Sequence, residues 1–266
     1  MINFPTAKIN LGLHIIEKRS DNFHNIETIF YPIRIADALE FIPAPIDSFS
    51  QSGISILGPN HDNLCMKALK LLRNDFTIPP LAIHLHKNIP IGAGLGGGSS
   101  DGATMLKMLN EYFDLKLTVI QLQNYGRQLG ADCAFFINNK PVLAEGKGDE
   151  LKMIEIDLSG YEIVVVMPQD IHVSTAAAYS GITPSKPIYK LKNLAEEPIE
   201  NWKNILMNDF ETRIFKCYPR IAELKQELYE LGAIYASMSG SGAALYGIFK
   251  EKINLSYLKN VAIFEG

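Results

Sequence analysis

A dense cluster of glycines constrains this chain more than any other feature. It is the segment from Pro90 to Asp101, with the sequence PIGAGLGGGSSD, in which five of twelve residues are glycine. The segment follows strand-like alternation over residues 81–85 and precedes a helix-like stretch over 103–109. Because glycine has no Cβ, the N–H groups of such a loop can turn inward together, and the next helix N-terminus adds unpaired donors. The pattern predicts a loop that wraps a phosphate group, with Ser99, Ser100 and Asp101 capping the helix.

Three sequence motifs compete for this loop. The P-loop motif ends in Gly-Lys-Ser/Thr, whereas here Gly98 is followed by serine. The spacing G-x-G-x-x-G occurs from position 92, but a dinucleotide fold also needs a second strand ending in an acidic residue about 20 residues on. Asp114 lies near that distance, yet residues 118–129 read as a helix. The third motif, Pro-x-x-x-Gly-Leu-Gly-Gly-Gly-Ser-Ser, fits the whole segment; a tight glycine turn without a ligand is the alternative.

Composition places the chain among ordinary globular proteins. Its 266 residues are 47% hydrophobic and 20% charged, enough for one large or two modest domains. The net charge is −4, and Lys87 has only His84 and His86 nearby, so nucleic acid is not an expected partner. The three cysteines are widely spaced without a C-x-x-C, which argues against a zinc knuckle or a disulfide framework and favours the cytoplasm. Neither a signal peptide nor a membrane-spanning run is predicted.

Hydrophobic periodicity predicts a mixture of strands and helices. Strands are predicted at 7–16, 26–33, 38–42, 161–167, 233–238 and 243–249. Helices are predicted at 63–73, 118–129, 202–215 and 221–231, and a surface connection at 183–198. Thr118 and Gly130 are the expected ends of the second helix. The sequence pattern changes near residue 150, so we predict two domains, 1–152 and 153–266.

The N-terminal strand carries a second chemical signal. Lys8 and Asn10 alternate with apolar residues and therefore share one face, where they could hold an anion or a hydroxyl group. A solvated strand face is the alternative. The turn-rich segment 18–28 places Phe23 beside His24, on the kind of loop that often carries binding residues.

Six segments, in order along the chain, resemble one family of small-molecule kinases. They are 7–11, 18–28, 94–101, 130–132, 144–148 and 238–243. The central loop resembles the GHMP kinase superfamily of galactokinases, homoserine kinases, mevalonate kinases and phosphomevalonate kinases. Its combination with Lys-Ile-Asn-Leu and Arg-x-Asp-x-Phe-His resembles the 4-diphosphocytidyl-2-C-methyl-D-erythritol kinases of the non-mevalonate isoprenoid pathway. Phe23 stands where that family commonly has tyrosine, and Gly102 where alanine is usual.

The resemblance implies a two-domain α+β GHMP kinase fold. A ribosomal-protein-like N-terminal domain would carry the loop, a ferredoxin-like C-terminal domain would follow, and the active site would lie in the cleft between them. ATP, with Mg²⁺, would phosphorylate the 2-hydroxyl of 4-diphosphocytidyl-2-C-methyl-D-erythritol. No nucleic acid or membrane partner is implied, and the protein would be a cytoplasmic monomer or homodimer. The alternatives are a GHMP kinase for homoserine or a mevalonate derivative, and a catalytically inactive nucleotide-binding homologue.

The resemblance also assigns roles to single residues. Asp132 would take the proton of the substrate hydroxyl. Lys8 would keep the Asp132 carboxylate ionised and orient the alcohol. The alternative role for Asp132 is helix capping. Nucleotide binding is implied for Pro90, Gly92, Gly94, Leu95, Gly96, Gly97, Gly98, Ser99, Ser100 and Asn63, with Ser100 also a metal contact. Substrate binding is implied for Asn10, Phe23, His24, Thr175, Tyr179 and Gly240.

Overall fold

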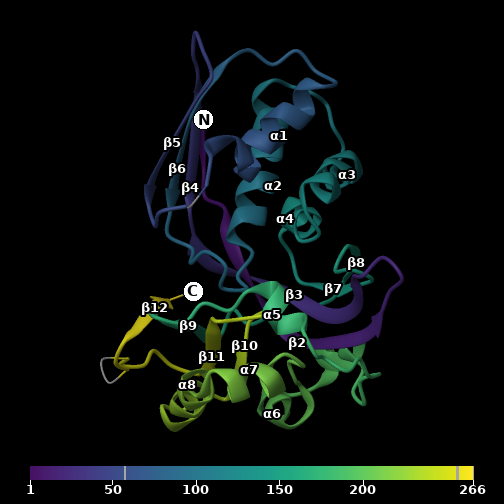
Figure 1. Ribbon diagram of the computed structural model, residues 1–266, viewed down its shortest axis with the longest axis vertical. Helices are drawn as coiled ribbons and strands as arrows, with labels where there is room; N and C mark the ends of the chain where they lie inside the picture. The colour runs from purple at the N-terminus through teal and green to yellow at the C-terminus, as the bar shows by residue number, and fades with distance from the viewer. Residues whose placement is uncertain (57, 256–257, 266) are drawn as a thin grey trace. The chain divides into compact units, whose positions relative to one another are not determined.

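The chain divides into two compact units whose segments alternate along the sequence. The computed structural model describes residues 1–56, 58–255 and 258–265 (Figure 1). Unit 1 comprises Met1–Ala7, Ile35–Ile91 and Gly96–Lys140, and unit 2 comprises Lys8–Arg34, Gly92–Leu95 and the chain from Pro141 onward. The glycine-rich loop therefore contributes to both units. The domain boundary at residue 152 stays a prediction.

Unit 1 is a sheet with helices on one face (Figure 1). The strand order is β1-β4-β6-β5, in which β5 runs parallel to β6 and the other pairs are antiparallel. These strands are β1 (Ile2–Asn3), β4 (Ala38–Pro43), β5 (Ser48–Gly53) and β6 (Leu81–Lys87). The helices are the short 3₁₀ helix η1 (Asn60–Asp62), α1 (Leu64–Arg73), α2 (Gly97–Tyr112), α3 (Val119–Leu129) and α4 (Cys133–Asn138). Thr118 and Gln121 form a capping box at the start of α3, as the sequence predicts for Thr118.

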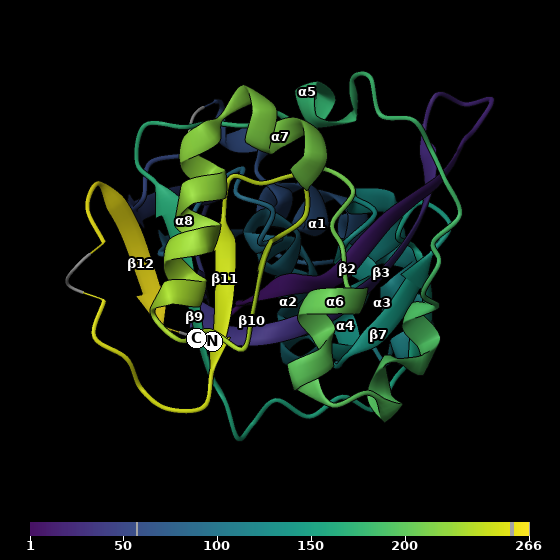
Figure 2. The ribbon, with the colours of Figure 1, turned by 90° about the horizontal axis from the view of Figure 1, so that it is seen from below.

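Unit 2 contains two sheets. One has the order β2-β3-β7-β8, and the other β10-β11-β9-β12. The strands of the first are β2 (Thr6–Lys18), β3 (His24–Ala36), β7 (Val142–Glu145) and β8 (Glu150–Met153). Those of the second are β9 (Glu162–Pro168), β10 (Tyr235–Met238), β11 (Leu245–Phe249) and β12 (Val261–Glu265). Figure 2 shows α8 (Pro219–Glu230) lying along this second sheet, where Leu224 and Leu228 are fully buried.

The remaining helices of unit 2 are short. They are α5 (Thr175–Tyr179), η2 (Leu191–Glu196), η3 (Ile199–Asn201), α6 (Trp202–Ile205) and α7 (Glu211–Cys217). The predicted surface connection at 183–198 is wrong in part, because Leu191 and Leu194 of η2 are fully buried. Among the described residues, no helix is long and apolar enough to cross a membrane.

The predicted single helix over 202–215 is also wrong. α6 ends at Ile205 and α7 begins at Glu211, because Asn208 between them pairs with Leu13 of β2 in a β-bridge. The buried Asn208 amide donates to the carbonyls of Met238 and Gly240, each at 2.8 Å. A side chain that satisfies distant backbone groups competes with helix formation at its own position.

Strand β2 is buried on both faces. Ile9, Leu11 and Ile15 are fully buried, as their alternation predicts. Lys8 and Asn10, on the other face, are only 3% and 2% exposed. The solvated strand face considered for these two residues is therefore wrong.

Candidate functional site

The glycine-rich loop joins the end of β6 to the start of α2. Gly92, Gly94 and Gly96 have φ values of +67°, +81° and +72°, a region that other residues rarely adopt. Helix α2 begins at Gly97, and Gly96 occupies the N-cap without a side chain to offer. The predicted capping by Ser99, Ser100 and Asp101 is therefore wrong. These three residues lie inside the helix, since the left-handed Gly96 turns the chain into it earlier.

Two glycines of the loop border open space. A Cβ built on Gly92 has no atom within 4 Å, and one on Gly98 meets only the Leu64 side chain, at 4.0 Å. The first N–H groups of any α-helix lack partners within the helix and carry partial positive charge. The start of α2 thus offers N–H donors beside Gly98, where a described side chain comes no closer than 4.0 Å, and this suits an anionic group.

Within unit 2, strand β2 holds the middle of the loop. The N–H of Lys8 donates to the carbonyl of Leu95 at 2.9 Å. The Lys8 ammonium donates to the carbonyl of Gly94 at 2.9 Å and to the side-chain oxygen of Asn10 at 2.7 Å. Asn10 is in turn oriented by its amide, which donates to Thr28 at 2.9 Å. The Lys8 ammonium is therefore buried and held in one orientation by its hydrogen bonds.

The segment around Gly240 packs on the same part of the loop. The Ser239 hydroxyl donates to the carbonyl of Gly94 at 3.0 Å, and a Cβ on Gly94 would lie 2.0 Å from the Ser239 carbonyl oxygen. A Cβ on Gly240 would lie 3.2 Å from Gly94. The structure thus brings together three of the predicted segments, those of Lys8, Gly94 and Gly240. Asn208, which holds the Gly240 carbonyl, carries no sequence signal that distinguishes it from a surface asparagine.

The aromatic residues predicted to bind substrate belong to unit 2. His24, at the start of β3, stacks on Tyr179 with ring centroids 4.8 Å apart and an interplanar angle of 23°. Burial, helped by the nearby Lys18, lowers the pKa of His24, so its imidazole is neutral at pH 7. Phe23 is 60% exposed and lies 5.2 Å from the Lys147 ammonium. Thr175 opens α5, and its hydroxyl lies 3.4 Å from that of Ser241.

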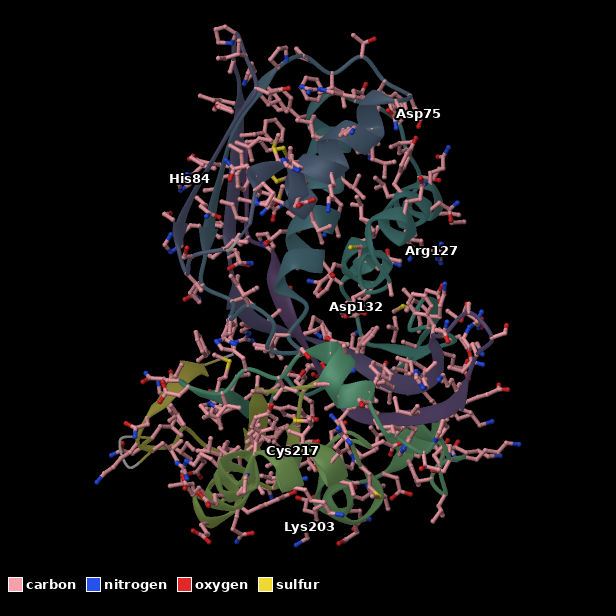
Figure 3. All side chains as sticks on the ribbon, in the orientation of Figure 1. Asp75, His84, Arg127, Asp132, Lys203 and Cys217 are labelled. Carbon is pink, nitrogen blue, oxygen red and sulfur yellow. The ribbon has the colours of Figure 1, made fainter. Side chains whose placement is uncertain are left out.

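Asp132 and Asn63 both occupy N-cap positions in unit 1, but only one of them caps. Asp132, labelled in Figure 3, precedes α4, and its side chain makes no capping hydrogen bond. The capping alternative for Asp132 is therefore wrong. Asn63 does cap α1, accepting from the N–H of Cys65 at 2.8 Å. Asn63 also lines a small cavity of about 80 Å³ together with Phe49 and Pro59.

Comparisons with known proteins identify the family. The family of GHMP kinases N terminal domain matches residues 63–140, and that of GHMP kinases C terminal matches residues 190–256. A 4-diphosphocytidyl-2-C-methyl-D-erythritol kinase of Bacteroides thetaiotaomicron is 50% identical over 273 residues, covering 100% of this chain and 99% of the relative. The chain belongs to the 4-diphosphocytidyl-2-C-methyl-D-erythritol kinase family. A relative of the same name in Chlorobium limicola is 40% identical, with 92% of this chain and 87% of the relative covered.

Solved structures of this and related kinases have the same fold. A crystal structure of a 4-(cytidine 5'-diphospho)-2C-methyl-D-erythritol kinase matches with a TM-score of 0.80 and 30% identity, covering 93% of this chain and 90% of that chain. The Methanococcus jannaschii mevalonate kinase matches with a TM-score of 0.73 at 15% identity, covering 100% and 97%. The predicted family and the α+β GHMP kinase fold are confirmed. The roles of the single site residues stay predictions.

Proposed function

We propose that this protein transfers the γ-phosphoryl group of ATP to the 2-hydroxyl of 4-diphosphocytidyl-2-C-methyl-D-erythritol. The observation that carries the proposal is the meeting of Lys8, Asn10, Gly94 and Gly240 in a member of this kinase family. Phosphoryl transfer depends on positioning and on neutralising charge, and a buried, oriented cation beside a glycine-rich loop serves both needs.

The loop residues suit the phosphates of ATP. The loop runs from Pro90 to Ser100, and its backbone N–H groups, which every residue but Pro90 carries, would serve as donors. A Cβ on Gly92 would have no neighbour within 4 Å, and one on Gly98 would contact only the Leu64 side chain, at 4.0 Å. ATP supplies the phosphoryl group, and the loop and the α2 N-terminus would hold its phosphates. Asn63, at the start of α1, is assigned to the nucleotide base.

Mg²⁺ is the second cofactor of the proposal. The part of the chain that the structure describes contains no group of three or more His, Cys, Asp or Glu side chains placed to bind a metal. Mg²⁺ in kinases is held largely by phosphates and water, with one or two protein ligands, so a single hydroxyl such as that of Ser100 fits this donor set. The bound ion would neutralise phosphate charge.

Asp132 and Lys8 are assigned to the proton transfer. Asp132, at the residue before α4, would accept the proton of the substrate hydroxyl. Lys8, donating to Asn10 and Gly94, would present its charge in a constant direction. Asn10 would hydrogen-bond the substrate near the same hydroxyl.

The cytidylyl group is assigned to the aromatic residues of unit 2. Phe23 offers an exposed ring for stacking, and neutral His24 offers one donor and one acceptor to a base edge. Tyr179, whose ring stacks on that of His24, would stack on the opposite face of the base, and Thr175 would contact the diphosphate. The proposal includes a cytoplasmic monomer or homodimer without a nucleic acid or membrane partner. Free Cys65, Cys133 and Cys217 suit a reducing compartment.

A substrate panel tests the proposed function. Purified protein with ATP and Mg²⁺ is given 4-diphosphocytidyl-2-C-methyl-D-erythritol, 2-C-methyl-D-erythritol 4-phosphate, homoserine or mevalonate. ADP release is measured, and phosphorus NMR locates the new phosphate. We expect turnover of the cytidylyl compound alone, with the phosphate on the 2-hydroxyl. Preference for homoserine or mevalonate would contradict the proposed substrate and support only a GHMP kinase of another specificity. Absence of turnover with every compound would favour an inactive homologue.

His24→Ala separates the two nucleotide sites. We expect it to raise KM for the cytidylyl substrate and to leave KM for ATP as it is, since a site built to pair a polar edge rejects poorly paired ligands. His61→Ala, at an exposed histidine of unit 1, is the matched control. If the variant lost ATP affinity and kept its affinity for the cytidylyl substrate, His24 would belong to the ATP site, and the assignment of the two sites would have to be reversed.

A further inference from the structure

A buried ionic cluster lies in unit 1 where β6 meets the glycine-rich loop. The ammonium of Lys87, the last residue of β6, donates to Asp101 at 2.7 Å and also to Asp37. Asp37 precedes β4, and Asp101 lies near the start of α2. The three side chains are 0–3% exposed. The cluster therefore joins the strand before the loop to the helix after it.

The cluster also reaches the backbone on both sides of the loop. The second oxygen of Asp37 accepts from the N–H groups of Asn88 and Ile89, at 2.6 and 2.8 Å. A Cβ built on Gly97, the first residue of α2, would lie 2.8 Å from the Ile89 side chain and 3.3 Å from the Lys87 ammonium. The chain entering the loop and the first helical residue are thus both packed against this cluster.

Stability alone does not account for charges at this position. Desolvating buried ions costs several kcal/mol each, and well-packed apolar side chains of similar volume often stabilise a protein equally or better. An ionic cluster does, however, fix directions, because its hydrogen bonds hold only in one geometry. Because the cluster lies next to the phosphate-wrapping loop, its fixed geometry can hold the loop in one conformation.

Asp101 is held in this cluster from several elements. Its bonded oxygen accepts from the Lys87 ammonium at 2.7 Å, and its other oxygen has no hydrogen-bond partner among the described residues. Asp37, between β3 and β4, and the buried Cys65 of α1 lie close to the same carboxyl group. The position of the Asp101 side chain, and with it the first turn of α2, therefore depends on the bond to Lys87.

We propose that Asp37, Lys87 and Asp101 form a positioning unit that holds the glycine-rich loop in its phosphate-binding geometry. The unit acts through the loop and touches no reacting atom. The inference rests on the proposed function where it concerns nucleotide affinity, but the ordering of the loop stands on the contacts within unit 1.

Amide hydrogen exchange without nucleotide tests the ordering directly. Lys87→Met removes the cation at nearly constant volume, and we expect faster exchange at Asn88, Ile89 and the first turn of α2. The control is Asp47→Asn, which weakens an ion pair with Arg73 and a bond to Leu81 at the opposite end of β6. That control should leave exchange in the loop as it is in the wild type. Unchanged loop exchange in a folded Lys87→Met variant would overturn the proposal.

Nucleotide affinity at a single pH gives a second readout that does not depend on Lys87→Met folding. Asp101→Asn keeps the shape of the side chain but weakens its bond to the Lys87 ammonium. By calorimetry, we expect its Kd for ADP to rise by up to about tenfold, and that of Asp47→Asn to equal the wild-type value. Wild-type loop exchange and wild-type ADP affinity in Asp101→Asn would overturn the proposal. If the wild type bound no ADP, the proposed function would fail, and the exchange experiment would still decide the ordering role.

Discussion

Gly98 is the residue whose identity the packing of the protein explains least. It lies in the first turn of α2, outside the left-handed region, and a Cβ there meets only Leu64 at 4.0 Å. Glycine within a helix costs about 0.5–1 kcal/mol relative to alanine. We therefore expect Gly98→Ala to raise the free energy of unfolding by roughly this amount and to weaken ADP binding, because the methyl group enters the space assigned to phosphate. Chemical denaturation and calorimetry measure the two effects.

The matched control for Gly98→Ala is Glu111→Ala, at the exposed far end of the same helix. It should leave ADP affinity at the wild-type value. If the Gly98→Ala protein gains stability and binds ADP as well as the wild type, the N-terminus of α2 is not part of the phosphate site.

Asp132 carries the second prediction at this scale. Asp132→Asn keeps the shape of the side chain but cannot accept the substrate proton. General acid–base catalysis contributes about 10²–10⁴-fold, so kcat should fall by that factor while ADP affinity is retained. Asp114→Asn, at an exposed residue of the same unit, is the control. Near-normal kcat at saturating substrate would exclude Asp132 as the base, whereas a stability loss alone would indicate a structural role.

At the scale of elements, the hairpin between β2 and β3 presents Phe23 and His24. Asp21 organises it by accepting from the Arg19 guanidinium at 3.1 Å and from the N–H of Phe23 at 3.1 Å, while the N–H of Arg19 donates to the Phe23 carbonyl. The hydrogen bond from Arg19 lowers the pKa of Asp21, so the carboxylate is ionised at neutral pH. The hairpin is thus shaped by its own side chains.

We expect Asp21→Ala to loosen this hairpin and to raise KM for the cytidylyl substrate severalfold, with kcat and KM for ATP close to wild type. Steady-state kinetics with each substrate varied in turn measure this. The contribution of the Asp21 carboxylate is present above its unfolded pKa and is lost as pH falls through its lowered folded pKa. A fall in kcat without a change in KM would contradict a role limited to presenting the two rings.

At the scale of the whole molecule, the proposal assigns two different ligands to one chain, and each should stabilise it. A ligand that binds only the folded state adds about 2.7 kcal/mol at one hundred times its Kd. For a protein of this size that corresponds to a rise in Tm of roughly 5–10 °C. Thermal unfolding with ADP and with the cytidylyl substrate, separately and together, measures these shifts.

His24→Ala should abolish the shift caused by the cytidylyl substrate and retain the shift caused by ADP. Gly98→Ala should do the reverse. If either ligand alone produced no shift in the wild type at high concentration, the corresponding site assignment would be wrong.

The sequence by itself determined the features whose causes are local. The glycine loop follows from residues that tolerate positive φ, the N-terminus of α3 from Thr118, and the inward face of β2 from the alternation of Ile9, Leu11 and Ile15. Backbone dihedrals, capping and side-chain periodicity act over a few residues, so they can be recognised along the chain. The family follows from the same motifs taken in order.

Only the tertiary structure decided the features whose partners are distant in sequence. Asn208 interrupts a helix because it bonds to Gly240, 32 residues away, and Lys87 is buried because Asp37, 50 residues away, neutralises it. Neither pairing has a local signature, since a hydrogen bond or a charge depends on distance in space and not on spacing along the chain. Burial of such polar groups is favourable only once the partner is in place, and that condition is set by the fold as a whole.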